Sequence, residues 1–514
     1  MSGTPQTPAT SETGPAPAGF FRRALRQKRF AFGFTVTLLV VLFASFMDLL
    51  DVTIVAVAAP DIQASLGATP AQLQWMIAAY ALSLGSALIT GGRIGDQYGR
   101  RRVFLTGLAA FVAASAACAL APTPEVLIAT RVAQGLAGGF MVPQVFGIIR
   151  SSLTPRQMGA ALGAYGGVQG LASIAGPLLG GLLVTANLFE LAWRTIFWVN
   201  VPVGLIALAV GARVLPESRR ADGRGARLDV PGAALLAVGL VLVLLPIVQG
   251  PAWGWPAWGW VLLGGGVAGI VLFLAWEQRL AHRGGLPVLD PALLANRAFV
   301  GGLFASLAFF GGIASFFLLL SIYLQDGTGR SALTTGLITL PYALGSMVTS
   351  GVGVALAPRH GRRLLITGSL LVAASHAAMW ALLVGLDAPV WWQLGGPLLL
   401  GGLGLGLAAP PLVNVVLAAV PGRVAGAAGG VLSTVNQVGG SIGVAALGTL
   451  FFAHVADALG PAGSGPWGAF TDAFAAVLPW QVGLYVVAAA LMTLLPAGTA
   501  PAEAVDAARI DRTE

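Results

Sequence analysis

Three ionisable residues lie inside long apolar segments, where charged side chains are costly. Asp48 and Asp51 fall in the apolar run 32–58, and Arg131 falls in the apolar run 125–149. A charge at the centre of a membrane helix costs about 2.5–3.5 kcal/mol on insertion scales, so such residues are functional candidates by default. Asp48 and Asp51 are three residues apart and therefore share one face of a helix.

Depth along the two segments predicts which polar residues can meet. Asp51 lies about two helical turns before the end of its segment, and Arg131 lies about two helical turns after the start of its own. That end and that start are on the same side of the membrane, so the two side chains reach a similar depth. An ion pair is therefore allowed, and Asp48 then comes level with Gln134. We expect these four residues to form a polar patch that faces a cavity between helices. The alternative is a fixed ion pair of Asp51 and Arg131 that only orients two helices.

A carboxylate beside an arginine could couple proton binding to a conformational change. The arginine disfavours protonation of the carboxylate, whereas separation or desolvation favours it. Moving one charge across the membrane potential is worth about 2.3 kcal/mol per 100 mV. A proton bound and released in this way could therefore drive a transport cycle.

Composition restricts the class of protein. Of the 514 residues, 56% are hydrophobic and 9% are charged, against roughly 25% charged in a soluble domain, which excludes a water-soluble fold. The one cysteine, Cys118, lies in an apolar stretch, so the sequence predicts no disulfide framework and no metal site. The net charge of +8 could indicate nucleic acid, but the basic residues lie between the apolar runs and instead indicate a membrane.

The apolar runs predict an all-α polytopic membrane protein of about fourteen spans, at ~20 residues per span. With the N-terminus inside, nearly all of the 28 Lys and Arg residues face the cytoplasm, as the positive-inside rule requires. We therefore expect a bacterial inner (plasma) membrane protein with both termini cytoplasmic. The predicted spans are 32–58, 71–92, 103–121, 125–149, 158–186, 195–213, 230–248, 258–277, 299–324, 333–357, 364–386, 390–420, 427–453 and 474–496.

A weak internal repeat predicts how the spans are organised. The stretch 159–163 recurs as 426–430, and Gly99-Arg-Arg recurs as Gly361-Arg-Arg. Both offsets fit two six-helix bundles with two inserted central helices, and repeated halves are common in secondary transporters. The expected parts are a disordered N-terminus (1–30), an N-terminal bundle (31–213), a linker with the inserted helices (214–298), a C-terminal bundle (299–497) and a cytoplasmic tail (498–514).

A short polar connection follows the second predicted span. Its arginines could be ordinary topology signals, but it also holds a carboxylate among glycines, a pattern typical of a tight turn that places the acid against arginines or a helix N-terminus. The residues that carry this pattern are Gly92, Asp96, Gly99, Arg100 and Arg101. They resemble the loop signature of the major facilitator superfamily, with Gln97 in place of the usual basic residue.

Other stretches resemble the fourteen-helix drug:proton antiporter branch of that superfamily. They are Leu50-Asp51-Val-Thr-Ile-Val-Ala-Val-Ala-Ala-Pro60, Arg131-Val-Ala-Gln134-Gly135, Gly176-Pro177-Leu-Leu-Gly180-Gly181 and Trp193-Arg-Thr-Ile-Phe197 with Asn200. Ala56 and Ala172 depart from the usual pattern. The likeness is detailed over the N-terminal half and looser beyond it.

The resemblance implies the major facilitator fold and an alternating-access carrier. It implies that Asp51, with Asp48, handles protons, that Arg131 couples them to the cycle, and that Asp96 with its arginines latches one conformation. The glycines around Pro177 would shape the bend of the fifth helix, although they could serve close packing alone. Asp48 replaces a residue that is usually small, so it could shift preference toward cationic substrates.

We therefore expect a proton-coupled exporter of amphipathic small molecules, with cationic compounds as candidate substrates. A dedicated exporter of one natural product or metabolite is the alternative within the carriers, and a non-transporting membrane sensor or scaffold is the alternative from another class. The sequence predicts no enzyme, because no nucleophile is paired with a base and no Walker-type loop is present. It predicts no cofactor and no nucleic-acid partner. The expected partners are small molecules, protons and the lipid bilayer, and the sequence leaves an accessory subunit undetermined.

Overall fold

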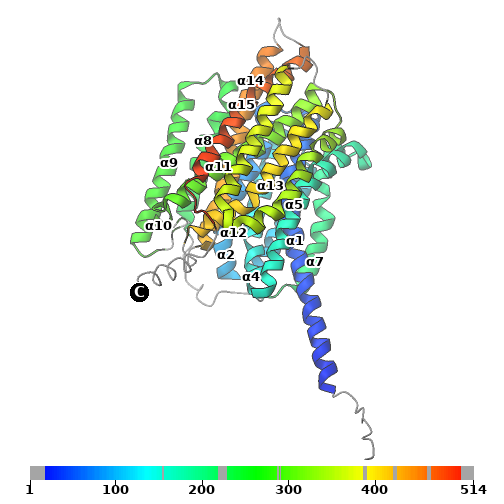
Figure 1. Ribbon diagram of the computed structural model, residues 1–514, viewed down its shortest axis with the longest axis vertical. Helices are drawn as coiled ribbons and strands as arrows, with labels where there is room; N and C mark the ends of the chain where they lie inside the picture. Colours follow the sequence, from blue (N-terminus) through cyan, green and yellow to red (C-terminus); the bar gives the residue numbers. More distant parts are fainter. Residues whose placement is uncertain are drawn as a thin grey trace, which may run out of the picture.

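The computed structural model describes residues 18–152, 155–217, 229–285, 287, 289, 291–385, 391–420, 425–459 and 465–498. These residues form a bundle of long helices that run roughly side by side (Figure 1). The helices are α1 Ala18–Leu66, α2 Pro70–Tyr98, α3 Arg100–Ala119, α4 Pro124–Ser152, α5 Pro155–Ala186, α6 Thr195–Trp198, α7 Asn200–Val214, α8 Val230–Trp253, α9 Ala257–His282, α10 Pro291–Leu294, α11 Arg297–Ile322, α12 Ala332–Gly385, α13 Gly395–Ala418, α14 Ala425–Ala458 and α15 Gly465–Met492.

The first helix is longer than the predicted span 32–58. Helix α1 begins at Ala18 and ends at Leu66, with Pro60 inside it. The chain leaves the helix at Gly67, whose φ of +61° suits glycine. Thr69 and Gln72 then form a reciprocal capping box at the start of α2, which fixes where the next helix begins. Helix α1 therefore extends beyond the predicted span at both ends, and its candidate membrane span is Thr35–Leu66.

Twelve helices in the described residues are long and apolar enough to cross a membrane, so the chain is a multi-pass membrane protein. The predicted count was fourteen. Two elements account for the difference: α5 contributes only a shorter apolar segment, 175–186, and one continuous helix, α12, occupies the place of the tenth and eleventh predicted spans.

Helix α12 changes direction near its middle. His360 has non-helical dihedral angles, φ −128° and ψ 19°. Gly353 and Gly368 lie on opposite sides of this residue, yet they approach the backbone of Gly406 and Gly404, which are two residues apart on α13. In a straight helix Gly353 and Gly368 would lie about 22 Å apart. The two parts of α12 therefore fold back toward each other and pack on the same part of α13.

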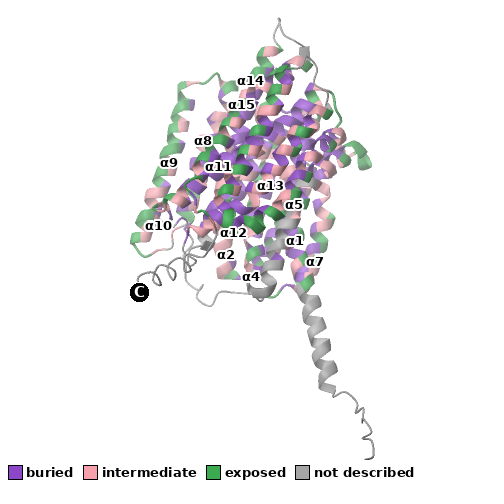
Figure 2. Ribbon diagram, viewed as in Figure 1, coloured by how far each residue is buried: buried purple, intermediate pink, exposed green. Residues whose placement is uncertain are grey.

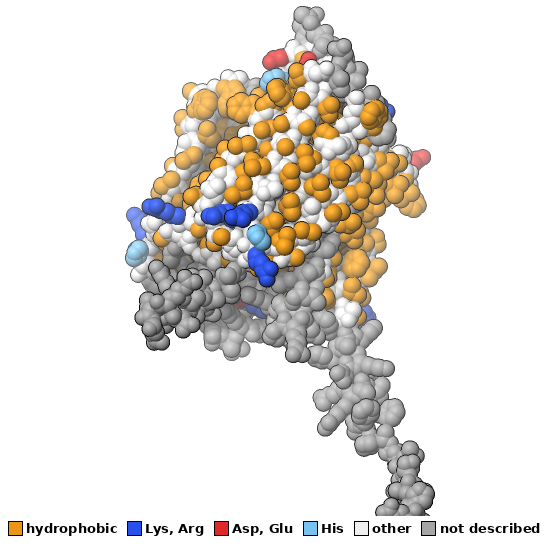
Figure 3. All heavy atoms as spheres, viewed as in Figure 1, with side chains coloured by type: hydrophobic (Ala, Val, Ile, Leu, Met, Phe, Trp, Pro, Cys, Tyr) orange, Lys and Arg blue, Asp and Glu red, His pale blue; other side chains and the backbone are white. Residues whose placement is uncertain are grey.

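Buried residues lie mainly in the middle of the bundle, and exposed residues lie mainly on its outer helices (Figure 2). Many exposed side chains are large and apolar, including Ile206, Val261 and Val348. Hydrophobic side chains cover much of the face shown in Figure 3, where the basic side chains gather mainly toward one end. This outer surface suits a lipid environment.

Helices α8 and α9 stand at one edge of the bundle (Figure 1) and are the least buried of the twelve. Helix α8 packs against α9, α2 and α14, so the inserted pair contacts both the earlier and the later part of the chain. The earlier and later helices also meet directly. Hydrogen bonds join α2 to α14, from Thr434 Oγ1 to the Gly85 carbonyl at 2.7 Å and from Ser441 Oγ to the Ala78 carbonyl at 3.2 Å.

Candidate functional site

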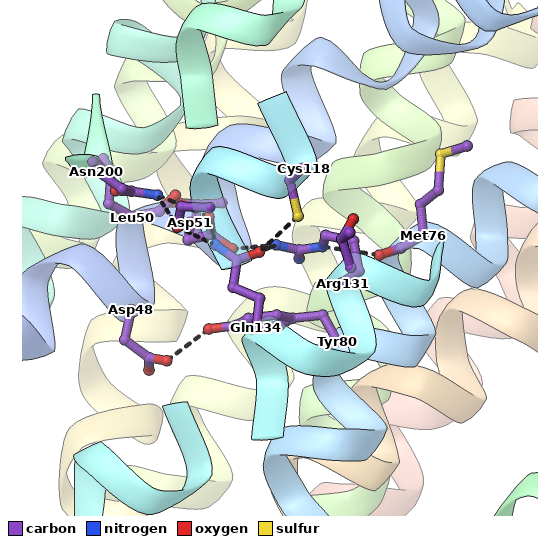
Figure 4. A network of polar contacts seen from close by, with 12 residues as sticks. Asp48, Leu50, Asp51, Met76, Tyr80, Cys118, Arg131, Gln134 and Asn200 are labelled. Carbon is purple, nitrogen blue, oxygen red and sulfur yellow. Dashed lines mark hydrogen bonds and ion pairs between the residues drawn. The ribbon is translucent and has the colours of Figure 1, made fainter. Parts of the chain in front are cut away.

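The polar residues predicted to meet in the N-terminal helices form one buried network (Figure 4). Helix α1 carries Asp51 and α4 carries Arg131, and these residues are 0% and 1% exposed. The Arg131 guanidinium forms an ion pair with Asp51 Oδ2. Its Nη1 also donates to Gln134 Oε1 at 2.7 Å, and its Nε donates to the Met76 carbonyl on α2 at 3.1 Å. The arginine therefore links α1, α2 and α4.

The second carboxylate oxygen of Asp51 is held by two amides. Gln134 Nε2 donates to Asp51 Oδ1 at 2.8 Å, and Asn200 Nδ2, from the first residue of α7, donates to the same oxygen at 3.1 Å. Ser115 Oγ on α3 accepts from Gln134 at 2.9 Å and lies 3.5 Å from the Asn200 amide. Both oxygens of Asp51 thus accept hydrogen bonds, and four side chains from α3, α4 and α7 surround this carboxyl group.

Tyr80 on α2 connects this network to Asp48. Its ring lies under the Arg131 guanidinium, 4.0 Å from centroid to guanidinium carbon, a distance typical of a cation–π contact. Its hydroxyl donates to Asp48 Oδ1 at 2.7 Å. One side chain therefore touches the buried arginine with its ring and the second carboxyl group with its hydroxyl.

Asp48 occupies a different setting from the one predicted. The prediction placed it level with Gln134 in one patch, but Gln134 bonds to Asp51, and Asp48 reaches the network through Tyr80. The three-residue spacing puts the two acids on one helix face, but it also separates them by nearly a turn, and the Tyr80 ring fills the space beside Arg131. Asp48 is half-buried, whereas Asp51 is fully buried.

The predicted connection after the second span is almost entirely helical, which corrects that prediction. Helix α2 continues to Tyr98 and α3 begins at Arg100, so the turn consists of Gly99, whose φ is 106°. The preceding glycines serve packing. A Cβ on Gly95 would meet the side chain of Gln144 at 1.8 Å, while one on Gly92 would lie an ordinary 3.6 Å from Pro143, both on α4.

The acid of this turn is held by the expected arginine. Arg100 Nη2 pairs with Asp96 Oδ1 at 2.8 Å, and Arg100 Nη1 also donates to the Gly147 carbonyl on α4 at 2.8 Å. Arg101 donates to the Ala212 carbonyl near the end of α7. These contacts fasten the α2–α3 turn to α4 and α7.

The glycines around Pro177 allow α5 to pack closely on two sides. Cβ atoms on Gly176 and Gly180 would come 1.9 Å from Thr53 Oγ1 and 2.8 Å from Ile54 Cγ1, both on α1. On the other side, a Cβ on Gly181 would come 2.4 Å from the Ala332 carbonyl at the start of α12. The structure therefore places this motif at a contact between the N-terminal helices and α12.

Sequence reasoning did not select Tyr80 or Ser115, and it noted Asn200 only as part of a motif. A tyrosine or serine in an apolar span carries no signal of its own, because both are common in structural roles. Asn200 could have been selected, since an amide inside a membrane span must find a partner.

Comparison with known proteins agrees with this architecture. Residues 41–444 match the Major Facilitator Superfamily, and the chain therefore belongs to that family.

Two relatives come from Streptomyces species. The chain is 40% identical to the "Probable actinorhodin transporter" of Streptomyces coelicolor, over 80% of this chain and 72% of the relative. It is 36% identical to the "Puromycin resistance protein pur8" of Streptomyces alboniger, over 89% of this chain and 90% of the relative. A crystal structure of the peptide transporter POT in complex with sulfate has the same fold, with a TM-score of 0.60 and 16% identity over 89% of this chain and 95% of that one.

Proposed function

We propose that the protein is a proton-coupled exporter of amphipathic small molecules that works by alternating access. The observation that carries the proposal is the buried pair of Asp51 and Arg131, joined through Tyr80 to the half-buried Asp48. Buried charges in membrane helices are costly, and a packing role alone could be met by apolar residues. The relatives named for antibiotic transport and resistance support export as the direction.

The two acids take different parts in the proposed cycle. Asp51 accepts hydrogen bonds on both oxygens and is the fixed counter-charge of Arg131. Asp48 has one hydrogen-bond partner among the described residues, the Tyr80 hydroxyl, and it is less buried than Asp51, so we assign proton exchange to Asp48. Protonation of Asp48 removes a charge beside Tyr80 and changes the field at Arg131, which links proton binding to the packing of α1, α2 and α4.

The other motifs take the roles that the family resemblance implies. Asp96, Arg100 and Arg101 fasten the α2–α3 turn in one state of the cycle, together with Gly92 and Gly99. Gly176, Pro177, Gly180 and Gly181 let α5 approach α1 and α12 closely in that state. The close contact of α5 with α12 closes one end of the pathway between the bundles.

We also propose that the chain crosses the membrane fourteen times. Helix α5 has 32 residues, enough to span, and α12 folds back on itself at His360, so that each of its parts can span. Two six-helix bundles, 31–213 and 299–497, then flank the linker 214–298 with α8 and α9. Basic side chains at one end of the bundle support cytoplasmic termini in a bacterial plasma membrane.

Purified protein in proteoliposomes tests this proposal directly. We expect puromycin and cationic dyes to accumulate only when a proton gradient is imposed, and we expect each transported molecule to move protons the other way. Asp48→Asn should abolish gradient-driven accumulation but retain substrate binding, and a protonophore should abolish transport by the wild type. Accumulation that continues without a proton gradient would refute the coupling.

A dedicated exporter of one natural product is the second candidate, because the two named relatives each carry the name of one antibiotic. The same assay distinguishes the two. A general exporter moves several unrelated compounds of the panel, and a dedicated one moves a single compound or its close analogues. No flux with any compound would instead favour a sensor or scaffold.

A further inference from the structure

Two buried carboxyl groups lie on the inserted helices, apart from the network around Asp51. Asp229 immediately precedes α8, and Glu277 lies near the end of α9; they are 7% and 1% exposed. Asp229 Oδ1 accepts from the Gly232 amide and from Trp276 Nε1, both at 2.9 Å. Glu277 Oε2 accepts from the Leu289 amide at 2.9 Å. Each acid thus uses one oxygen as an acceptor.

The remaining oxygens, Asp229 Oδ2 and Glu277 Oε1, have no hydrogen-bond partner among the described residues. A Cβ added to Gly232 would lie 2.2 Å from the first oxygen and 2.5 Å from the second. The two oxygens therefore converge on one point and are separated by no more than the sum of these distances. Two ionised carboxylates in a buried site repel each other, so such pairs hold a proton.

The charged group that faces this pair from another described element is Arg93 on α2. It attracts both carboxylates electrostatically, and its guanidinium donates to the Pro287 carbonyl, two residues before the amide that binds Glu277. Two ionised acids beside one arginine leave an excess negative charge in a buried place. One proton added to the pair balances the arginine, and it supplies the donor that the facing oxygens lack.

We propose that Asp229 and Glu277 together bind one proton, between Asp229 Oδ2 and Glu277 Oε1, and so form a second proton site on the inserted helices. The site joins the start of α8 to the end of α9, and α8 also packs against α2. Arg93 lies three residues before Asp96 on α2, so gain or loss of this proton acts on the contact between the end of α2 and the segment that follows α9.

Amide substitutions test the shared proton, because an amide places an N–H where the proton lies. In Glu277→Gln the amide donates to Asp229, and in Asp229→Asn it donates to Glu277. We expect each single variant of the full chain in detergent to keep a Tm close to that of the wild type at neutral pH. The double variant sets two N–H groups face to face, so its Tm should fall by more than the sum of the single shifts.

The pH dependence of Tm gives an independent readout. A carboxyl group that binds its proton more tightly in the folded state adds stability at low pH, and this stability is lost as the pH rises through deprotonation in the folded state. The wild type should therefore lose Tm with rising pH more steeply than Glu277→Gln. Asp457→Asn, at an exposed acid on α14, is the control and should keep the wild-type slope.

Three results would overturn the proposal. In the first, Glu277→Gln and Asp229→Asn lower the Tm by similar amounts and the double variant lowers it by their sum, which indicates two ionised carboxylates. Another is a wild-type Tm that depends on Na⁺ at constant pH, which indicates a metal cation instead. If the amide variants do not fold, infrared spectra of Asp48→Asn test the proposal, because this variant keeps Asp229 and Glu277 but lacks the Asp48 carboxyl group. Absence of a protonated-carboxyl band at neutral pH contradicts the shared proton, and a retained band supports it.

Discussion

The ring of Tyr80 lies 4.0 Å below the guanidinium carbon of Arg131. The hydroxyl of the same tyrosine donates to Asp48 at 2.7 Å. The contact therefore places the buried cation and the half-buried acid on two ends of one rigid side chain. A change in the charge of Asp48 therefore alters its hydrogen bond with the Tyr80 hydroxyl, and a movement of the Tyr80 ring alters its contact with Arg131.

Removing that hydroxyl should move the pH profile of transport without unfolding the protein. Tyr80→Phe keeps the aromatic ring beside Arg131 but takes away the donor to the Asp48 carboxylate. A lost donor disfavours the ionised form, so the pH profile of efflux should shift upward by about one unit, the equivalent of about 1.4 kcal/mol.

Efflux rates in proteoliposomes at a series of pH values measure this shift. Tyr98→Phe is a matched control, because Tyr98 is exposed at the end of α2. An unchanged profile in Tyr80→Phe would show that Asp48 does not set the pH dependence.

The α2–α3 turn predicts a defect in rate that leaves binding intact. Asp96→Asn removes the charge that holds Arg100, while Arg100 can still donate to the Gly147 carbonyl. We expect transport to slow several-fold, with little change in drug affinity because the turn is remote from the buried network. The half-exposed pair contributes about 0–1 kcal/mol, so Tm should change little.

Arg102→Gln provides the comparison for that variant, since Arg102 faces Glu217 at 3.8 Å with a largely exposed side chain. Its transport rate should match the wild type. Parallel losses of binding and transport in purified Asp96→Asn protein would be incompatible with a latch.

The sequence predicted the position of most spans and the contact of Asp51 with Arg131. Both depend on simple rules: apolar length locates a span, and depth along two spans decides whether two charges can meet. Helix ends were harder, because prolines and glycines have two uses in membranes. Pro60 remains inside α1, and Gly95 packs α2 against Gln144 instead of forming a turn.

The place of Asp48 could not be predicted for a different reason. Its partner is set by the tyrosine that fills the space between α1, α2 and α4, and such packing depends on how three helices meet. The pair of Asp229 and Glu277 escaped prediction because both acids lie at the ends of predicted spans, where charges are ordinary. Only their shared burial distinguishes them.

Close approach of α5 to α12 predicts a conformational bias. Gly181→Ala would place a Cβ 2.4 Å from the Ala332 carbonyl, a backbone atom that cannot move aside alone. The state with α5 and α12 in contact should therefore lose population relative to the state with this contact open. Spin labels at Leu188 and Ser331, both exposed, should report a larger fraction of long distances in Gly181→Ala.

The control lies on the same helix as Ala332. Gly351→Ala adds the same methyl group to α12 where nothing lies within 4 Å, so its distance distribution should equal that of the wild type. A distribution in Gly181→Ala that also equals the wild type would mean that the close contact does not limit the conformational equilibrium.

The sharpest prediction separates the two acids of α1. Asp51→Asn leaves Arg131 buried without its counter-charge, which costs about 3–5 kcal/mol, so its Tm should fall clearly. Among the described residues, Asp48 accepts a hydrogen bond from a hydroxyl and has no ion-pair partner, so the Tm of Asp48→Asn should stay near the wild-type value while proton-driven efflux is lost. Adding Arg131→Gln to Asp51→Asn removes the unpaired cation and should restore much of the Tm but not transport.

Thermal unfolding in detergent, measured beside proton-linked efflux, reports both effects. If Asp51→Asn instead keeps its Tm and Asp48→Asn keeps uphill efflux, the roles assigned to the two acids are reversed: Asp51 carries the proton, and Asp48 only holds Tyr80 in place.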